Sequence, residues 1–74
     1  MKLPRVDGKK LVKGLQKLGF EVVRVRGSHF HLYSSEKDIL VTVPCHAGRT
    51  LSPKTLKAIL RSAKINVEEL LKVL

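Results

Sequence analysis

Residues 22–33 read VVRVRGSHFHLY, and this stretch decides the fold. Apolar and polar side chains alternate on both sides of Gly27-Ser28, which predicts two β-strands joined by a two-residue loop. Glycine at the first position of such a loop favours a type II′ turn. That turn fixes which residues stand opposite each other in the hairpin. The predicted pairs are Arg26–His29, Val25–Phe30, Arg24–His31, Val23–Leu32 and Val22–Tyr33.

The predicted hairpin has two chemically different faces, because residues directly opposite share a face and side chains alternate with period two. The apolar face, which we expect in the core, consists of Val23, Val25, Phe30 and Leu32. The other face, which we expect in solvent beside an anion, consists of Arg24, Arg26, His29, His31 and Tyr33. Cations next to titratable imidazoles make this second face the first place to look for function.

A helix is predicted before the hairpin. Asp7 can cap its start, and apolar residues then recur at helical spacing. These apolar residues are Leu11, Val12, Leu15 and Leu18. Gly19 follows as the residue that ends the helix. Gly14, inside the helix, costs about 1 kcal/mol relative to alanine, so we expect another element to approach closely there.

A third strand is predicted over residues 39–43, after a polar loop at 34–38, and Pro44 ends it because proline cannot donate to a sheet ladder. One face of this strand carries Ile39, Val41 and Val43, and the other carries Leu40 and Thr42. Ser52-Pro53 predicts the start of a second long helix, whose inward residues are Leu56, Ile59, Leu60 and Ala63. A capping box formed by Asn66 and Glu69 predicts a short C-terminal helix.

The order of these elements predicts an α+β fold in one domain over residues 1–74. Both long helices have a single apolar stripe, so we expect them to cover the same face of a three-stranded antiparallel sheet. The opposite face of the sheet then stays in solvent. That arrangement agrees with the polar face of the hairpin.

The charge of the chain indicates a polyanionic partner. Fifteen Lys and Arg residues against six Asp and Glu residues give a formal net charge of +9 in 74 residues, and such a balance favours nucleic acid, an acidic membrane surface or an acidic protein. Only 4% of residues are aromatic, which argues against a base-stacking platform. The single cysteine, Cys45, fits a reducing compartment, and no stretch is apolar enough to cross a bilayer. We therefore expect a cytoplasmic protein with no membrane partner.

His29 is the candidate catalytic residue, because an imidazole held after a tight turn can exchange a proton near neutral pH. Arg24 and Arg26 would bind a phosphodiester and stabilise the charge that develops on it. This set supports RNA cleavage by attack of the ribose 2′-hydroxyl, with no metal and no cofactor. The further predicted RNA contacts are Ser28, His31, Lys9 and Lys13.

Three other interpretations remain open on the residues alone. His29 can be an ordinary exposed strand residue of a non-catalytic RNA-binding module. The basic surface can serve only to dock an acidic partner protein. A zinc site is also conceivable, because a His-x-His pair on one strand can chelate the metal. Its ligands would be His29, His31, Cys45 and His46.

The chain resembles the HicA toxins, the small messenger-RNA interferases of HicA–HicB toxin–antitoxin modules. The matching segments are Leu18-Gly19-Phe20, Arg26-Gly27-Ser28-His29, Val41-Thr42-Val43-Pro44 with His46 after it, and the closing helix over residues 51–65. The likeness covers almost the whole chain, and residues 67–74 extend past the point where many family members end.

The resemblance implies a double-stranded-RNA-binding-domain-like α-β-β-β-α fold with His29 as the catalytic residue. It also implies ribosome-independent endonucleolytic cleavage of mRNA and growth arrest when the toxin is unopposed. A HicB antitoxin that covers the active site is the implied partner.

Overall fold

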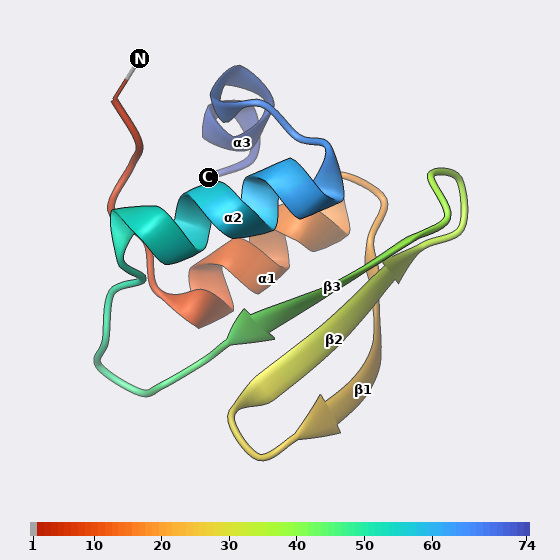
Figure 1. Ribbon diagram of the computed structural model, residues 1–74, viewed down its shortest axis with the longest axis horizontal. Coiled ribbons are helices and arrows are strands. Elements are labelled where there is room, and N and C mark those ends of the chain that lie inside the picture. Colours follow the sequence, from red (N-terminus) through yellow and green to blue (C-terminus); the bar gives the residue numbers. More distant parts are fainter. Residues whose placement is uncertain (1) are drawn as a thin grey trace.

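A computed structural model describes residues 2–74; the prediction of one domain over 1–74 therefore includes Met1, which lies outside the described residues. The elements are α1 (Gly8–Lys17), β1 (Glu21–Arg26), β2 (His29–Ser34), β3 (Ile39–Pro44), α2 (Pro53–Ala63) and α3 (Val67–Val73). The three strands form one antiparallel sheet in the order β1-β2-β3. Helices α1 and α2 lie side by side over one face of this sheet, and α3 packs against α1 (Figure 1). The predicted α+β, double-stranded-RNA-binding-domain-like architecture is confirmed.

Side-chain caps start all three helices, as the sequence predicts. Asp7 accepts a hydrogen bond from the Lys10 amide at 2.7 Å, which satisfies one of the free N–H groups of the first turn of α1. Ser52 does the same for α2 through the Thr55 amide. Asn66 and Glu69 form a reciprocal capping box at the start of α3. These local contacts set where each helix begins.

The core lies between the sheet and the helices. Most residues predicted for the inward faces of β3, α1 and α2 are buried there: Leu11, Val12, Leu15, Val41, Val43, Leu56, Ile59, Leu60 and Ala63. Leu18 and Ile39, also predicted to face inward, are half-buried against this core. The predicted close approach at Gly14 is also confirmed, since a Cβ atom there would lie 3.3 Å from Val73 Cγ2 of α3. Gly14 thus lies in the contact between α1 and α3.

The β1–β2 hairpin turns where the sequence predicts. Gly27 has φ +60, and Ser28 is outside the left-handed region, which fits a type II′ and not a type I′ turn. The pairs nearest the turn are those predicted, from Arg26–His29 to Arg24–His31. The hairpin therefore presents its two histidines opposite its two arginines.

The register is wrong beyond Arg24, because Val23 forms a β-bulge and pairs with no residue of β2. Val22 instead stands opposite Leu32, and Glu21 stands opposite Tyr33. A regular ladder would have turned Glu21 to the helix-covered face, where its carboxylate would lose water. The bulge keeps Glu21 on the solvent side and lets Val22 face the core.

The prediction that the whole apolar face of the hairpin is buried is also wrong. Leu32 is fully buried, and Phe30 is half-buried. Val23 and Val25, however, are 54% and 52% exposed. Val23 lies in the bulge, and Val25 lies near the end of β1, which projects away from the helices (Figure 1). No helix covers these two side chains.

Candidate active site

The solvent-exposed side of the sheet, here called the outer face, carries most of the residues predicted to act on RNA. By register and alternation it consists of Glu21, Arg24 and Arg26 on β1, His29, His31 and Tyr33 on β2, and Leu40, Thr42 and Pro44 on β3. The helices within residues 2–74 all lie on the opposite side of the sheet (Figure 1). The outer face is therefore open to a large ligand such as a nucleic acid.

His29 is the first residue of β2 and is exposed. Its neighbours across the sheet are Arg26 on β1 and Pro44 on β3. The preceding residue, Ser28, is half-buried in the turn, and its carbonyl oxygen accepts a 2.6 Å hydrogen bond from the Cys45 amide. This bond extends the β2–β3 pairing past Pro44 and fixes the turn from which His29 projects.

His31 stands between Arg24 on β1 and Thr42 on β3. Its Nδ1 atom lies 2.9 Å from the Thr42 hydroxyl oxygen, within hydrogen-bond distance. The ring is half-buried, so it is held more firmly than the exposed ring of His29. The sequence places Thr42 on the outer face but does not predict this contact, which depends on the register of β3 against β2.

Tyr33 closes the far end of the outer face. Its hydroxyl group donates a 2.7 Å hydrogen bond to the Asp38 carboxylate. This bond raises the pKa of Tyr33 above its ordinary value, with smaller contributions from desolvation and from the charge of Asp38. Asp38 itself has φ +54 in the loop before β3. The phenol is thus kept neutral and fixed in place.

The outer face carries two arginines and one carboxylate, Glu21, which lies at the end of the sheet far from His29. Arg24 and Arg26 are both exposed. Asp7 and Glu69 are committed to helix caps, and Asp38 accepts from Tyr33. With two arginines against one glutamate on this face, and a net charge of +9 on the whole chain, we expect the outer face to attract phosphate groups.

Lys9 and Lys13 are exposed on α1. They line a hollow of about 240 Å³ together with Val12, Gln16, Val22 and Phe30. The side chains of Val22 and Phe30 belong to the helix-covered side of the sheet, so this hollow lies around the β1 edge from the outer face. The structure therefore brings together Arg24, Arg26, Ser28, His29 and His31, and it leaves the two lysines on a neighbouring surface.

The four residues of the zinc alternative do not come together. Within residues 2–74, no three His, Cys, Asp or Glu side chains are grouped so as to hold a metal ion. Cys45 is half-buried, and its thiol points to the Val43 carbonyl oxygen at 3.7 Å. Burial raises the pKa of this thiol, Asp7 raises it further, and Lys9 opposes the shift. A thiol kept protonated is a poor metal ligand.

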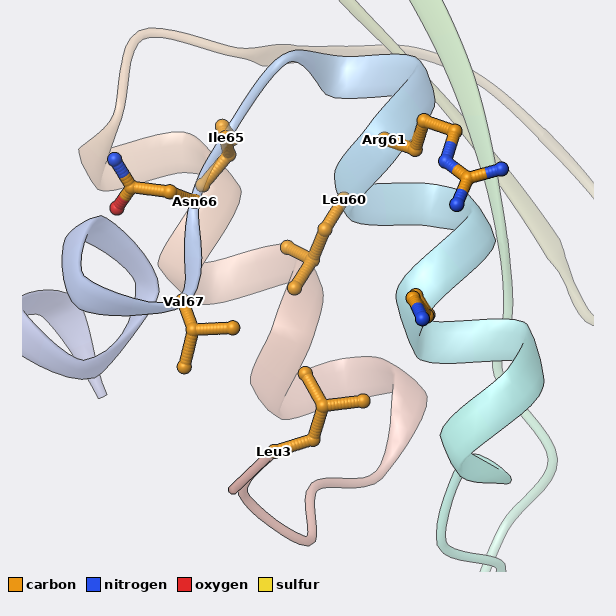
Figure 2. A pocket seen from close by; sticks show the side chains of 7 residues that line it. Leu3, Leu60, Arg61, Ile65, Asn66 and Val67 are labelled. Atoms are coloured by element: carbon orange, nitrogen blue, oxygen red, sulfur yellow. The ribbon is translucent and has the colours of Figure 1, made fainter. Parts of the chain in front are cut away.

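A second, larger hollow lies on the helical side of the molecule. It measures about 420 Å³ and is lined by Leu3, Lys57, Leu60, Arg61, Ile65, Asn66 and Val67 (Figure 2). Its lining is largely apolar and contains no histidine, cysteine or carboxylate. Its one proton-transfer group is Lys57, whereas the outer face combines two imidazoles with two arginines, so the outer face is the candidate active site.

Residues 8–65 match the family described as the HicA toxin of bacterial toxin–antitoxin systems. The match covers most of the chain, from the first residue of α1 to the residue before the α3 cap. The chain belongs to the HicA toxin family. Because toxins of this family belong to toxin–antitoxin systems, the family implies an antitoxin as the partner protein. No curated protein matches the chain.

The part of the chain that matches the HicA toxins contains every predicted site residue, from Lys9 to His31. Helix α3 and the N-terminal residues before α1 lie outside the match. The larger hollow is therefore built partly from Leu3, Asn66 and Val67, which are not part of the matched region. Among residues 2–74, no helix has the length and apolar character needed to cross a membrane.

Proposed function

We propose that this HicA-family toxin is an endoribonuclease that cleaves mRNA without a metal ion, with His29 as its catalytic residue. The observation that carries the proposal is the position of His29. Its exposed imidazole stands on the open outer face, directly opposite Arg26, at the start of a strand fixed by a tight turn. A toxin acting on a polyanion needs this combination of a proton-transfer group and nearby cations.

In the proposed reaction, neutral His29 accepts the proton of a ribose 2′-hydroxyl group. The 2′-oxygen attacks the adjacent phosphorus, the bond to the 5′-oxygen breaks, and the products carry a 2′,3′-cyclic phosphate and a 5′-hydroxyl group. Arg24 and Arg26 stabilise the charge on the phosphate oxygens during this step. DNA is not a substrate because it lacks the nucleophile.

The contacts to the rest of the RNA follow the positive surface. Ser28 at the turn and His31 on β2 flank the scissile phosphate in this proposal. Lys9 and Lys13, exposed around the β1 edge, bind the backbone of the strand that leaves the outer face. A HicB-like antitoxin that covers the outer face would exclude the RNA and neutralise the toxin, as the resemblance to the family implies.

The test compares purified wild-type protein with His29→Gln, using an RNA oligonucleotide in excess chelator. We expect the wild type to cleave the RNA and the variant to lose roughly 10²- to 10⁴-fold in rate. The matched control is His46→Gln, which removes an exposed imidazole from the loop after β3 and should cleave at the wild-type rate. Addition of the cognate antitoxin should stop cleavage.

The same experiment separates the proposal from the two binding interpretations. RNA that the wild type binds in a salt-sensitive manner but does not cut would identify a non-catalytic RNA-binding module. RNA that is not bound even at low ionic strength would indicate a surface that only docks an acidic protein. Equal cleavage by the wild type and His29→Gln would contradict the role of His29.

A further inference from the structure

The contact between His31 and Thr42 is the one hydrogen bond between side chains on the outer face of β2 and β3. Within residues 2–74, the other hydrogen bond between two side chains that involves β2 or β3 joins Tyr33 to Asp38, which lies in the loop at the opposite end of the outer face. A hydroxyl oxygen can accept from Nδ1–H whether the imidazole is neutral or charged. Thr42 can therefore hold the ring in one orientation through a protonation cycle, with Nε2 left to exchange a proton.

RNA cleavage by a 2′-hydroxyl group requires two proton transfers at opposite sides of the phosphorus. One removes the proton of the nucleophile, and the other supplies a proton to the leaving 5′-oxygen. His29 and His31 are two positions apart on one strand, so their side chains project from the same face about 6.6 Å apart. That spacing can accommodate a phosphodiester between the two rings.

Resting on the proposed function, we infer that His31 is the general acid that protonates the leaving 5′-oxygen, with Thr42 as its positioning residue. His29 takes the proton of the 2′-hydroxyl group as the bond between the 2′-oxygen and phosphorus forms. The bond between phosphorus and the 5′-oxygen breaks, and the 5′-oxygen receives the Nε2 proton of His31. The cycle leaves His29 protonated and His31 neutral, and exchange with water restores both.

The groups around His31 are compatible with binding a phosphate beside it. Arg24 faces it from β1 and Thr42 from β3. His29 and Tyr33 flank it on β2, with Arg26 and Glu21 as their partners on β1. The helices within residues 2–74 lie on the other side of the sheet from these groups (Figure 1). A bound phosphodiester would neutralise part of the positive charge of the two arginines and bring its leaving oxygen to His31.

The decisive test uses two RNA substrates with a single cleavable linkage. One carries the normal 5′-oxygen, and the other carries sulfur in its place, because a thiolate leaves without being protonated. In His31→Gln, glutamine can still bond to Thr42 but cannot donate a proton as an acid. We expect this variant to lose roughly 10²- to 10⁴-fold on the oxygen substrate and to cleave the sulfur substrate within about tenfold of wild type.

Several outcomes would overturn the assignment. Cleavage of the oxygen substrate by His31→Gln at the wild-type rate would exclude a catalytic role, and an equal loss on both substrates would identify a binding or structural role. His29→Gln is the internal reference, because it should stay slow on both substrates. If the wild-type protein cleaves neither substrate, the proposed function fails. If the wild type cleaves both but His31→Gln is slow on the sulfur substrate as well, only the role of His31 as general acid is removed.

Two further measurements test the assignment: the cleavage rates of two Thr42 variants, and the dependence of the cleavage rate on pH. Thr42→Ser keeps the hydroxyl group and should retain the wild-type rate, whereas Thr42→Val should lose roughly two- to tenfold, the value of one hydrogen bond. The wild-type rate should fall at high pH as the acid loses its proton, and His31→Gln should lack that descending limb. Equal rates for Thr42→Val and Thr42→Ser, or an unchanged limb in His31→Gln, would contradict the proposal.

Discussion

The two edge strands of the sheet, β1 and β3, have similar alternating sequences but very different surroundings. β3 buries Val41 and Val43 beneath the helices, whereas β1 leaves Val23 and Val25 more than half exposed. The difference shows that alternation identifies the two faces of a strand but does not determine whether a helix reaches them. Here the strand with the weaker packing carries the arginines that face the histidines.

The two loops that flank β2 also differ, in the hydrogen bonds that hold them to the rest of the fold. In the loop before β3, Lys37 Nζ donates to the carbonyl oxygens of Ala63 and Lys64 at the end of α2, at 3.3 and 3.1 Å. The same ammonium group lies 6.0 Å from the centre of the Phe20 ring. At the other end, the carbonyl oxygen of Ser28 in the Gly27-Ser28 turn accepts a hydrogen bond from the Cys45 amide. The loop before β3 is thus tied to α2 by a lysine side chain, whereas the candidate-site end of the sheet is held through the end of β3, where Gly8 of α1 packs against Pro44 and Cys45.

The largest loss of stability should come from a substitution at Gly8, the first residue of α1, which packs against the end of β3. A Cβ atom at this position would collide with the Pro44 carbonyl oxygen and lie 2.7 Å from Cys45 Cα, so backbone atoms would have to move. We expect Gly8→Ala to lower the free energy of unfolding by about 3 kcal/mol, measured by denaturant unfolding. Gly14→Ala is the matched control, because it meets only movable side-chain ends of α3 and gains helix propensity, and it should change stability by less than about 1 kcal/mol. Similar losses in both variants would contradict the claim that β3 is anchored through Gly8.

A valine-to-alanine pair compares the two edge strands directly. Val43→Ala removes two methyl groups from a fully buried site and should lower the free energy of unfolding by about 2 kcal/mol. Val25→Ala makes the same change at a side chain that is 52% exposed, and its effect should stay within about 0.5 kcal/mol. If thermal or denaturant unfolding gives equal losses for the two variants, the helices cover β1 more than the structure indicates.

The smallest predicted effect is a shift in the pKa of Tyr33, which lies at the end of β2 next to the loop that Lys37 ties to α2. It is the single tyrosine in a chain without tryptophan, so the ultraviolet absorbance of phenolate reports on it alone. Its bond to Asp38 raises the pKa, so ionisation should begin at higher pH than in a free tyrosine, and Asp38→Asn should shift the midpoint down. Because folding favours the neutral phenol, this contribution to stability is present below about pH 10 and disappears as the pH rises past the raised pKa. An unchanged midpoint in Asp38→Asn would show that the bond is absent in solution.

Local signals made much of the fold predictable from the sequence. The caps at Asp7, Ser52 and Asn66 each involve residues three positions apart, so neighbouring sequence is enough to identify them. The turn at Gly27 and the close approach at Gly14 were predictable for a similar reason, since glycine is costly unless the backbone or a neighbour requires it. The predicted roles of the site residues remain predictions that the experiments above address.

The remaining features depend on contacts distant in sequence. The bulge at Val23 arises from the need to keep Glu21 in solvent while Val22 enters the core, which no local pattern reveals. The bond between His31 and Thr42 requires the β2–β3 register, and that register depends on the conformation of the loop at Asp38. The exposure of Val25 depends on how far the helices extend over the sheet.

The bulge at Val23 also separates two parts of the chain that would otherwise constrain each other. The pairing between Arg26 and Arg24 and their partners on β2 is set from the turn, while the pairing of Glu21 and Val22 is set from the end of α1. One unpaired residue between them lets the two segments of β1 follow different registers against β2. The positions of the two imidazoles opposite the arginines are therefore set from the turn, whatever pairing the segment next to α1 requires.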